Sequence, residues 1–326
     1  MPMDGKQIKH LNQQVRELRH ATAKGQVFKQ LDRLAGDLIE QTPRHPRTPI
    51  ATVEDDAAFY DELRQMYEKL QDDQLDQVSD VWLLSLLDHF KVDDPAIRLN
   101  GCLMIFNALL ANDLLTNDQL RLSFHYLAQN DILLGHIDEP KNRAVFGRAT
   151  ALSALASLLY ADRAGYFFLQ AYEVDRLVDL VAMILVMEKD TRGFVGEQGW
   201  AHMYAELANV LGELSQREEL VRGDKVCLMA LLLANYSRLT TPLIMGENEQ
   251  LADYLVNLMN QHQVYRRYFL LALRNWRLRL RASRPQNAGN WHQIFNYRRL
   301  MQCLLMVNDL PEQIGKVILE QDDQNE

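Results

Sequence analysis

The amino-acid sequence predicts an all-α protein, either an irregular α-solenoid of HEAT-like helical hairpins or, as the alternative, a compact all-α bundle. Apolar residues recur three and four positions apart, as in the segments 63–71, 81–88 and 251–259, whereas the alternation typical of strands is nearly absent. Short breaks separate the helical segments, and the expected helix pairs begin at intervals of roughly 40 to 55 residues, close to the period of HEAT-type helix pairs. We expect at least about 65% helix, well above the one-third of an average domain.

The N-terminal part differs from the rest of the chain. Two polar helices are expected at 5–22 and 26–40, and three prolines between residues 43 and 49 mark a linker. We therefore predict two regions, residues 1–50 as polar N-terminal helices with their linker and residues 51–326 as a helical-repeat domain.

Helix-start signals divide the repeat region. Asp94 can cap a helix that has Pro95 at its first position, where proline's missing N–H costs nothing, and Thr116 can cap another. Helix pairs are expected to begin near Asp55, Asp94, Ala144, Gly199, Glu247 and Gly289.

The composition is that of a folded protein, with 48% hydrophobic and 24% charged residues. The three cysteines, Cys102, Cys227 and Cys303, lie far apart inside apolar stretches, so neither a disulfide framework nor a zinc pattern is present. The N-terminus lacks a hydrophobic signal region, and the apolar runs 177–187 and 226–234 are too short to cross a bilayer. We expect a cytoplasmic protein that needs no membrane, metal or cofactor.

The segment 190–202 is the most unusual part of the chain, because three glycines fall within seven residues. A helix is predicted from Trp200 onward, with Trp200 on its broad apolar face. On this interpretation Trp200→Ala costs about 3–5 kcal/mol through a cavity. A narrow polar face carries His202, Glu206, Asn209 and Glu213.

The polar face has two interpretations, a solvated stripe or the lining of a concave groove. In the second, His202 and Glu206 lie one turn apart and could act as an acid–base pair. A metal would need a third ligand, and we predict none. Arg148 is expected to pair with an acid such as Asp190. Glu247 is expected in the first turn of its own helix, where the helix dipole favours a negative charge. The candidate groove residues are Arg148, Asp190, Arg192, Trp200, His202, Glu206, Asn209 and Glu247.

The motif Asp190-x-Arg-Gly-Phe-Val-x-x-x-Gly-Trp-x-His202 resembles the central motif of a bacterial family known as domain of unknown function 2785. Further matches are Val145-Phe-Gly-Arg148, Gly246-Glu-Asn-Glu-Gln-Leu-Ala252 and Asn296-Tyr-Arg-Arg-Leu300, so that the similarity covers about residues 120–310. The family pattern continues with an alanine–histidine pair and an aspartate, where this chain has Glu206 and Asn209. The resemblance implies a helical fold and a bacterial cytosolic origin, and it implies no activity.

The segment 264–284 is rich in arginine although the net charge of the chain is −9. Its candidate binding residues are Arg266, Arg267, Arg274, Arg277 and Arg281. They could contact nucleic acid or another anionic partner, or they could neutralise the acidic remainder of the protein. The overall acidity favours neutralisation, so a nucleic-acid partner is not expected.

The leading functional hypothesis is a binding or scaffold module with a concave groove around residues 190–213 that holds a protein or a small ligand. The first alternative is an enzyme that uses His202 and Glu206 as its acid–base pair. The second is a nucleic-acid-associated factor that acts through the arginine-rich helix. No nucleotide-binding loop, nucleophile elbow or other catalytic motif is visible.

Overall fold

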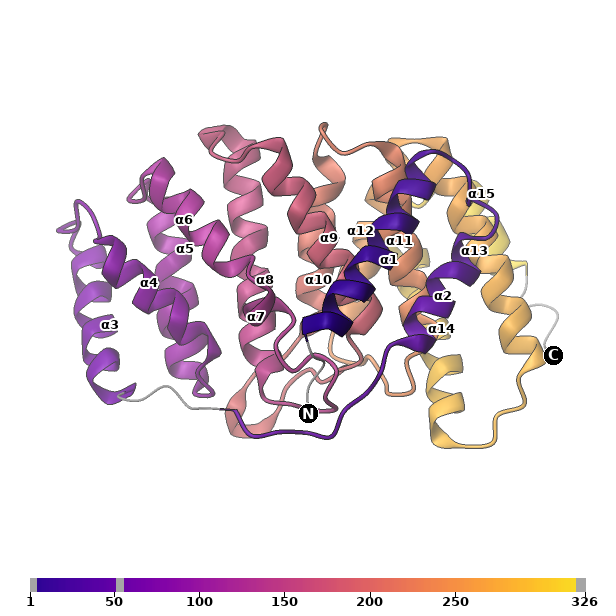
Figure 1. Ribbon diagram of the computed structural model, residues 1–326, viewed down its shortest axis with the longest axis horizontal. Coiled ribbons are helices and arrows are strands. Elements are labelled where there is room, and N and C mark those ends of the chain that lie inside the picture. The colour runs from indigo at the N-terminus through magenta and orange to yellow at the C-terminus, as the bar shows by residue number, and fades with distance from the viewer. Residues whose placement is uncertain (1–4, 51–55, 321–326) are drawn as a thin grey trace. The chain divides into compact units, whose positions relative to one another are not determined.

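A computed structural model describes residues 5–50 and 56–320 of the protein (Figure 1). Within these residues the chain is 72% helical and contains no strand, which confirms the predicted all-α class and helix content. Among the described residues, extended backbone pairing is limited to an isolated antiparallel bridge between Phe194 and Trp200. The choice between a solenoid and a bundle stays a prediction.

The chain divides into two compact units, which are described separately. The first unit contains Arg44–Leu180 and Arg192–Glu213, and the second contains Val181–Thr191, the described residues after Glu213, and those before Arg44. This division differs from the predicted one between residues 1–50 and 51–326, which stays a prediction about independent folding.

The first unit is built from α3 to α8, with the adjoining parts of α9 and α10. Their bounds are α3 Asp56–Gln71, α4 Asp80–Asp88, α5 Met104–Ala111, α6 Asn117–Leu127, α7 Asn130–Leu133, α8 Ala144–Ala161, α9 Ala171–Met187 and α10 Met203–Gln216. Four further helical segments are η1 His89–Lys91, η2 Ala96–Leu103, η3 Asp162–Tyr166 and η4 Gly196–Gln198. Helix α5 continues η2, and α5 packs against α3 and α8, whereas α6 packs between α4 and α8.

The predicted helix starts in this unit agree with the capping geometry. The Asp94 carboxylate accepts the backbone N–H of Ala96 at 2.8 Å, one residue beyond Pro95. The Thr116 hydroxyl accepts the N–H of Gln119 at 3.2 Å, and the Gln119 side chain accepts the N–H of Thr116 at 3.1 Å. Both ends of this reciprocal box satisfy backbone donors that the helix itself leaves open. The start expected near Asp55 falls outside the described residues, and α3 is described from Asp56.

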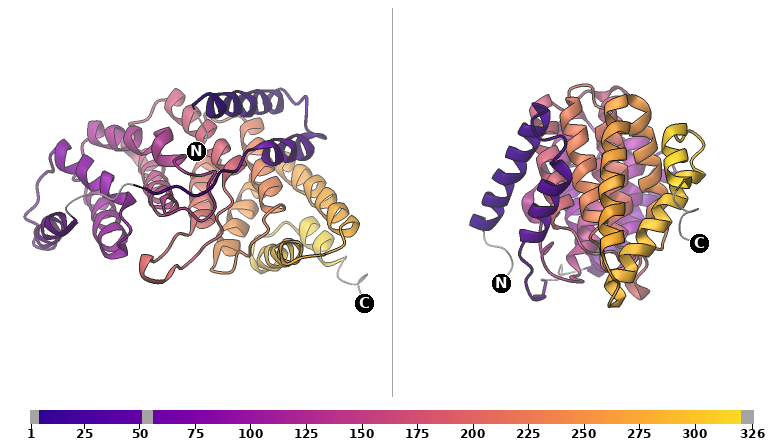
Figure 2. Two further views of the ribbon diagram at one scale, coloured as in Figure 1. Left: turned by 60° about the horizontal axis from the view of Figure 1, so that its bottom comes forward. Right: turned by 90° about the vertical axis from the view of Figure 1, so that its right-hand side faces the viewer.

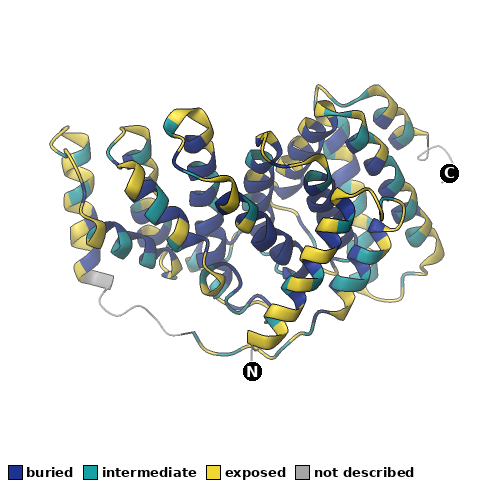
Figure 3. Cartoon of the chain, turned by 45° about the horizontal axis from the view of Figure 1, so that its top comes forward, coloured by how far each residue is buried: buried dark blue, intermediate teal, exposed yellow. Residues whose placement is uncertain are grey.

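Helix α8 packs against α5, α6 and α7 and is largely buried in the first unit. Figure 3 shows how burial is distributed along the chain. The apolar helix Ala144–Tyr166 is long enough to cross a membrane by length and composition, but 72% of its apolar window is buried inside the protein. Leu152, Leu155, Leu158 and Leu159 are all inaccessible to solvent. A helix that is apolar on nearly every side and covered by its neighbours is a core helix.

The linker before α3 is anchored to the loop that precedes α8. The Glu139 carboxylate accepts the backbone N–H of Thr48 at 2.7 Å and the Thr48 hydroxyl at 2.6 Å. Burial acts to raise the pKa of Glu139, but hydrogen bonds from Thr48, His136 and Asn142 outweigh it and lower this pKa to about 2. The carboxylate is therefore ionised and fixes the linker.

The second unit contains the N-terminal helices, α1 Gly5–Ala23 and α2 Leu31–Gln41, together with the C-terminal ones. The latter are α11 Arg222–Tyr236, α12 Glu247–Gln261, α13 Gln263–Ala282, α14 Ala288–Met306 and α15 Glu312–Leu319. Helix α12 packs against α13 and α14, and α11 against α13 (Figure 2).

Helices α1 and α2 confirm the two polar helices expected near the N-terminus, and both pack on α11. They bury Leu11, Val15 and Leu18 of α1 and Leu31, Ala35 and Ile39 of α2. The Arg19 guanidinium contacts the Asp224 carboxylate at 2.8 Å, with each side chain 10% exposed. The N-terminal helices therefore belong to the core of the second unit.

Candidate ligand groove

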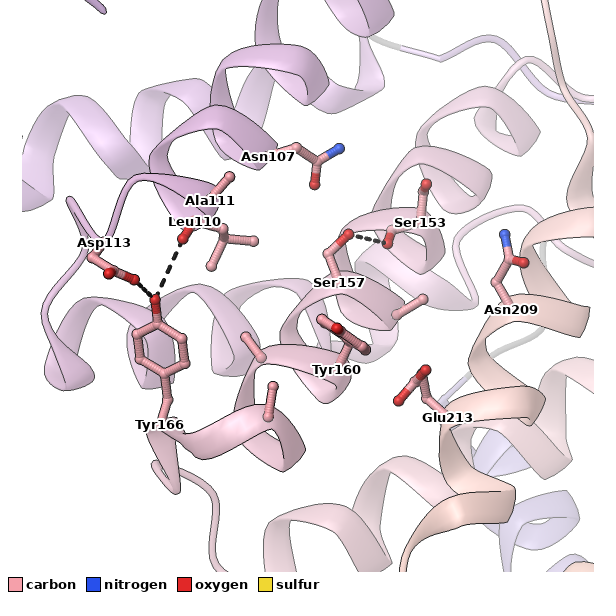
Figure 4. Close-up of a pocket in the computed structure, with 13 residues that line it drawn as sticks. Asn107, Leu110, Ala111, Asp113, Ser153, Ser157, Tyr160, Tyr166, Asn209 and Glu213 are labelled. Carbon is pink, nitrogen blue, oxygen red and sulfur yellow. Dashed lines mark hydrogen bonds between the residues drawn. The ribbon is translucent and has the colours of Figure 1, made fainter. Parts of the chain in front are cut away.

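Helices α5, α8 and α10 of the first unit line an open groove with a cavity volume of about 640 Å³ (Figure 4). This volume lies within the range of about 300–1,000 Å³ that is typical of small-molecule sites. The lining residues are Asn107, Leu110, Ala111, Asp113, Ser153, Ala156, Ser157, Tyr160, Ala161, Ala164, Tyr166, Asn209 and Glu213.

Helix α8 contributes a polar stripe to the groove. Ser153, Ser157 and Tyr160 are four and three residues apart and therefore share one face of the helix. The Tyr160 side chain is 57% exposed, in contrast to the buried leucines around it. This stripe was not among the site residues predicted from the sequence. The sequence pattern that could have predicted it is three polar groups at helical spacing within an otherwise apolar helix.

Helix α10 contributes part of the polar face that the sequence predicted. Asn209 and Glu213 line the groove, as the groove-lining interpretation of this face requires. Glu206 is mostly buried and lies one turn before Asn209, from whose amide nitrogen it accepts a hydrogen bond at 3.0 Å. The Ser153 side chain also hydrogen-bonds to the Glu206 carboxyl, which links α10 to the polar stripe of α8.

Burial raises the pKa of the Glu206 carboxyl above its ordinary value of 4.5. Hydrogen bonds from Asn209 and Ser153 and the charge of nearby His202 oppose this shift without cancelling it. A carboxyl with a raised pKa beside a cavity has the electrostatics of a proton-exchanging group.

This shift predicts that Glu206→Gln stabilises the protein at neutral pH. The folded state binds the Glu206 proton more tightly than the unfolded state, so this carboxyl destabilises the fold once pH rises through its folded pKa. Urea unfolding of parent and variant from pH 4 to pH 8 should show a gain at pH 7 that shrinks as pH falls toward 4.5. A variant that is less stable than the parent at pH 7 would contradict the prediction.

Two further carboxylates of the groove are already partnered. Asp113 accepts a hydrogen bond from the Tyr166 hydroxyl. Glu213 accepts hydrogen bonds from the Arg163 guanidinium through both carboxylate oxygens, with the Nη2–Oε2 distance at 3.0 Å and the Nη2–Oε1 distance at 3.3 Å. The Arg163 guanidinium also lies 5.4 Å from the centre of the Tyr160 ring.

The segment from Arg192 to His202, here called the glycine loop, differs from the prediction. Helix α10 begins at Met203, so Trp200 does not lie on its apolar face. Trp200 is instead 40% exposed, with its ring 5.3 Å from that of Phe194 and 4.2 Å from that of His202. The backbone of His202 has a φ of +48°, which a non-glycine residue rarely adopts and which interrupts the helix.

Two arginines, the buried Arg98 and the half-buried Arg192, hold the glycine loop in place. Arg192 donates to the carbonyl of Asn142 at 2.8 Å, and Arg98 donates to the carbonyl of Gln198 at 2.6 Å. Both guanidinium groups lie over the Phe146 ring, at 5.7 Å and 4.8 Å from its centre. Arg192 is therefore an anchor of the loop and does not line the groove.

The exposure of Trp200 changes the expected effect of its truncation. Trp200→Ala should cost about 1–2 kcal/mol, because it removes two ring contacts without leaving a buried cavity. Trp276 of α13 is 3% exposed and packs against Tyr236 and Tyr297, so Trp276→Ala should cost about 3–5 kcal/mol. Urea unfolding of both variants measures the difference. Equal losses would show that Trp200 is a core residue after all.

The remaining predicted groove residues do not line the cavity. Arg148 is buried in α8 and donates to the carbonyl of Gly135 at 2.8 Å. Asp190 and Glu247 belong to the second unit, where the backbone N–H of Asp190 donates to Glu188 and the Glu247 carboxylate accepts the N–H of Met245, both at 2.8 Å. The expected pair of Arg148 with Asp190 stays a prediction.

The arginines of α13 divide into structural and exposed ones. Arg277 is buried and donates to the Tyr297 hydroxyl at 2.6 Å and to the carbonyl of Val317 at 2.9 Å. Arg279 pairs with Asp32 of α2, and Arg266 is half-buried. Arg267, Arg274 and Arg281 are exposed and make no ion pair with the described part of the chain. Helix α13 therefore uses two of its arginines for packing.

Residues 5–50 and 56–320 contain no group of three or more histidine, cysteine, aspartate or glutamate side chains that could hold a metal ion. Cys102 and Cys227 are buried and Cys303 is half-buried, and all three are free thiols.

Comparison with known proteins identifies a family. No curated protein and no solved structure matches the chain. The model of a family described as protein of unknown function (DUF2785) matches residues 133–306, which include α8, the glycine loop and α10 as well as α11 to α14. The matched region covers more than half of the chain. The chain therefore belongs to the DUF2785 family.

Proposed function

We propose that this protein is a binding module whose ligand site is the groove between α5, α8 and α10. One observation carries the proposal: polar side chains from three helices converge on a cavity of about 640 Å³ whose lining also includes four alanine residues. Cavities of this size with a few converging polar groups are the usual form of a small-molecule site.

The groove offers hydrogen-bonding groups that the protein does not use itself. The Asn107 side chain makes no hydrogen bond within the described chain, and it faces the cavity from α5 (Figure 4). Asn209 uses its amide nitrogen on Glu206, so its carbonyl oxygen is available to a ligand. Groups held on helices are better fixed than groups on loops, which favours specific binding.

A blocking variant tests the groove as a ligand site. Ala111 is exposed at the end of α5 and lines the cavity, so Ala111→Trp should fill the groove without disturbing the core. A library of small polar molecules is screened against the parent by ligand-observed NMR. We expect hits whose binding weakens at least about tenfold, by 1.4 kcal/mol, in Ala111→Trp.

The matched control is Ala282→Trp, which adds the same bulk to an exposed position of α13 in the second unit. This variant should bind the hits as the parent does. Hits that both variants retain, or a screen without hits, would overturn the proposal.

A second candidate function is acid–base catalysis by Glu206 with His202. It is favoured by the raised pKa of the Glu206 carboxyl beside the cavity. For any ligand found in the screen, Glu206→Gln should then abolish turnover while leaving binding in place. A ligand that stays chemically unchanged during incubation with the parent argues for the binding module alone.

A further inference from the structure

We propose that the exposed face of helix α14, together with the end of α13 that precedes it, binds single-stranded nucleic acid. Residues 254–308 contain nine arginines and no aspartate, glutamate or lysine, although the whole chain carries a net charge of −9. This surface belongs to the second unit, so the proposal is independent of the groove in the first unit. A cationic surface with exposed aromatic rings matches the phosphates and the bases of an unpaired strand.

The arginines of this region do not serve mainly to pair with acids of the same chain. Arg279 pairs with Asp32 of α2, and the buried Arg277 donates to groups within the fold. The other seven make no ion pair with the described residues 5–50 and 56–320. The sequence favoured neutralisation, but ion pairing within the described chain uses one of the nine charges. Most of them are therefore available to an anionic partner.

Helix α14, labelled in Figure 1, presents a stripe of aromatic and polar side chains to solvent. Trp291, Phe295, Arg298 and Gln302 follow one another at intervals of four, three and four residues and therefore share one face. Trp291 is 50% exposed and Phe295 is 42% exposed, and their ring centres lie 6.3 Å apart. The other side of α14 is buried, and the helix packs against α12. The two rings therefore stand on a fixed support without being covered.

Arginine side chains lie beside these rings. The guanidinium groups of Arg298 and Arg299 are each 5.9 Å from the centre of the Phe295 ring. Arg281 in the last turn of α13 and Arg284, four residues before the start of α14, are both exposed. The surface thus combines rings that can stack on bases with charges that can bind phosphates, as in proteins that bind single strands without sequence preference.

The acidic remainder of the chain opposes such binding only weakly at physiological salt. Surface charges are largely screened beyond about 8 Å at 0.15 M ionic strength. Burial and the charges of Glu249 and Asp253 on α12 raise the pKa of the Cys303 thiol. Cys303 lies about 100° around α14 from Gln302, so these two acids are on the α12 side of the helix and not on the stripe. A strand on the stripe would interact chiefly with the arginines beside it.

An unpaired strand fits this face better than other anionic partners do. The bases of a duplex already stack on one another, so Trp291 and Phe295 would find no free base. An acidic peptide would contact the arginines but has no bases to cover the rings. An anionic bilayer favours an unbroken apolar face, which Arg298 and Gln302 interrupt.

Fluorescence anisotropy of the full chain with a labelled 12-nucleotide oligouridylate tests the proposal. We expect saturable binding that weakens as salt rises, because counterions return to the phosphates. The double variant Trp291→Ala/Phe295→Ala should weaken binding at least about tenfold through loss of base stacking. Arg298→Gln should lower the slope of log K against log salt by about 0.7, the value for one phosphate contact on a single strand.

The matched controls are Tyr172→Ala and Arg176→Gln on α9, which remove an exposed ring and an exposed arginine one turn apart in the first unit. Both should bind the oligouridylate as the parent does. Equal losses in these controls, or no binding to the parent at low salt, would overturn the inference. Polyglutamate that binds as tightly as the oligouridylate would indicate an acidic protein partner instead. Binding to phosphatidylserine vesicles without binding to the oligouridylate would indicate a bilayer, and either result would also overturn it.

Discussion

Arg98→Met should lower the free energy of unfolding by about 3–5 kcal/mol and release the glycine loop. The Arg98 side chain is fully buried and donates to the carbonyl groups of Val92 at 2.7 Å, Asp93 at 2.9 Å and Gln198 at 2.6 Å. Methionine fills the space but supplies no donor, so one buried and two part-buried carbonyls lose their hydrogen-bond donor, at about 1–3 kcal/mol each before relaxation. Burial, opposed by the charge of Asp94, lowers the pKa of Arg98 to about 10.

Urea unfolding measures the loss, and hydrogen exchange of residues 192–202 measures the release of the loop. The control is Arg267→Met on the exposed face of α13, which should change stability by no more than about 0.5 kcal/mol. Unchanged exchange in the loop of Arg98→Met would mean that the contact with Gln198 does not hold it.

Gly223→Ala should destabilise the second unit by about 3 kcal/mol and detach α1 from α11. A Cβ atom at Gly223 would lie 2.4 Å from the Cα and 2.8 Å from the backbone nitrogen of Ala23. Backbone atoms cannot turn aside as a side chain can, so α1 must shift, and overpacking of this kind costs about 1–3 kcal/mol. The shift also strains the buried pair of Arg19 with the neighbouring Asp224.

Gly212→Ala is the matched control, because a Cβ atom at this position of α10 meets nothing within 4 Å. It should be neutral or stabilise the helix by up to about 1 kcal/mol, as alanine does in place of glycine. Urea unfolding and hydrogen exchange of α1 and α2 compare the two. Equal stability of both variants would show that α1 does not pack as closely on α11 as the structure describes.

The contact of α1 and α2 with α11 could not be read from the sequence. Both helices look polar, and the prolines after them suggest a separate region. Their apolar residues are few but lie on one face, which α11 covers. Their partner α11 lies about 200 residues further along the chain, so no local pattern in the sequence indicates the contact.

The candidate site was foreseen in part. The helical wheel grouped Glu206, Asn209 and Glu213 correctly, because these residues lie within an uninterrupted helix. It placed Trp200 wrongly, because it extended that helix across Gly199 and His202. Gly199 has a φ of +72° and approaches Pro95 so closely that a Cβ atom would lie 2.9 Å from the Pro95 ring. The loop conformation depends on that distant contact, which no periodicity contains.

Local signals in the sequence were enough to predict the all-α class, the capped helix starts at Asp94 and Thr116 and the family, because these depend on periodicity, capping chemistry and a continuous motif. Which polar side chains share a cavity depends instead on tertiary packing. Asn107, Ser153 and Asn209 come from three helices and meet through the packing of α5, α8 and α10. Tertiary contacts also decided which arginines are buried anchors, since burial and partners depend on residues remote in the chain.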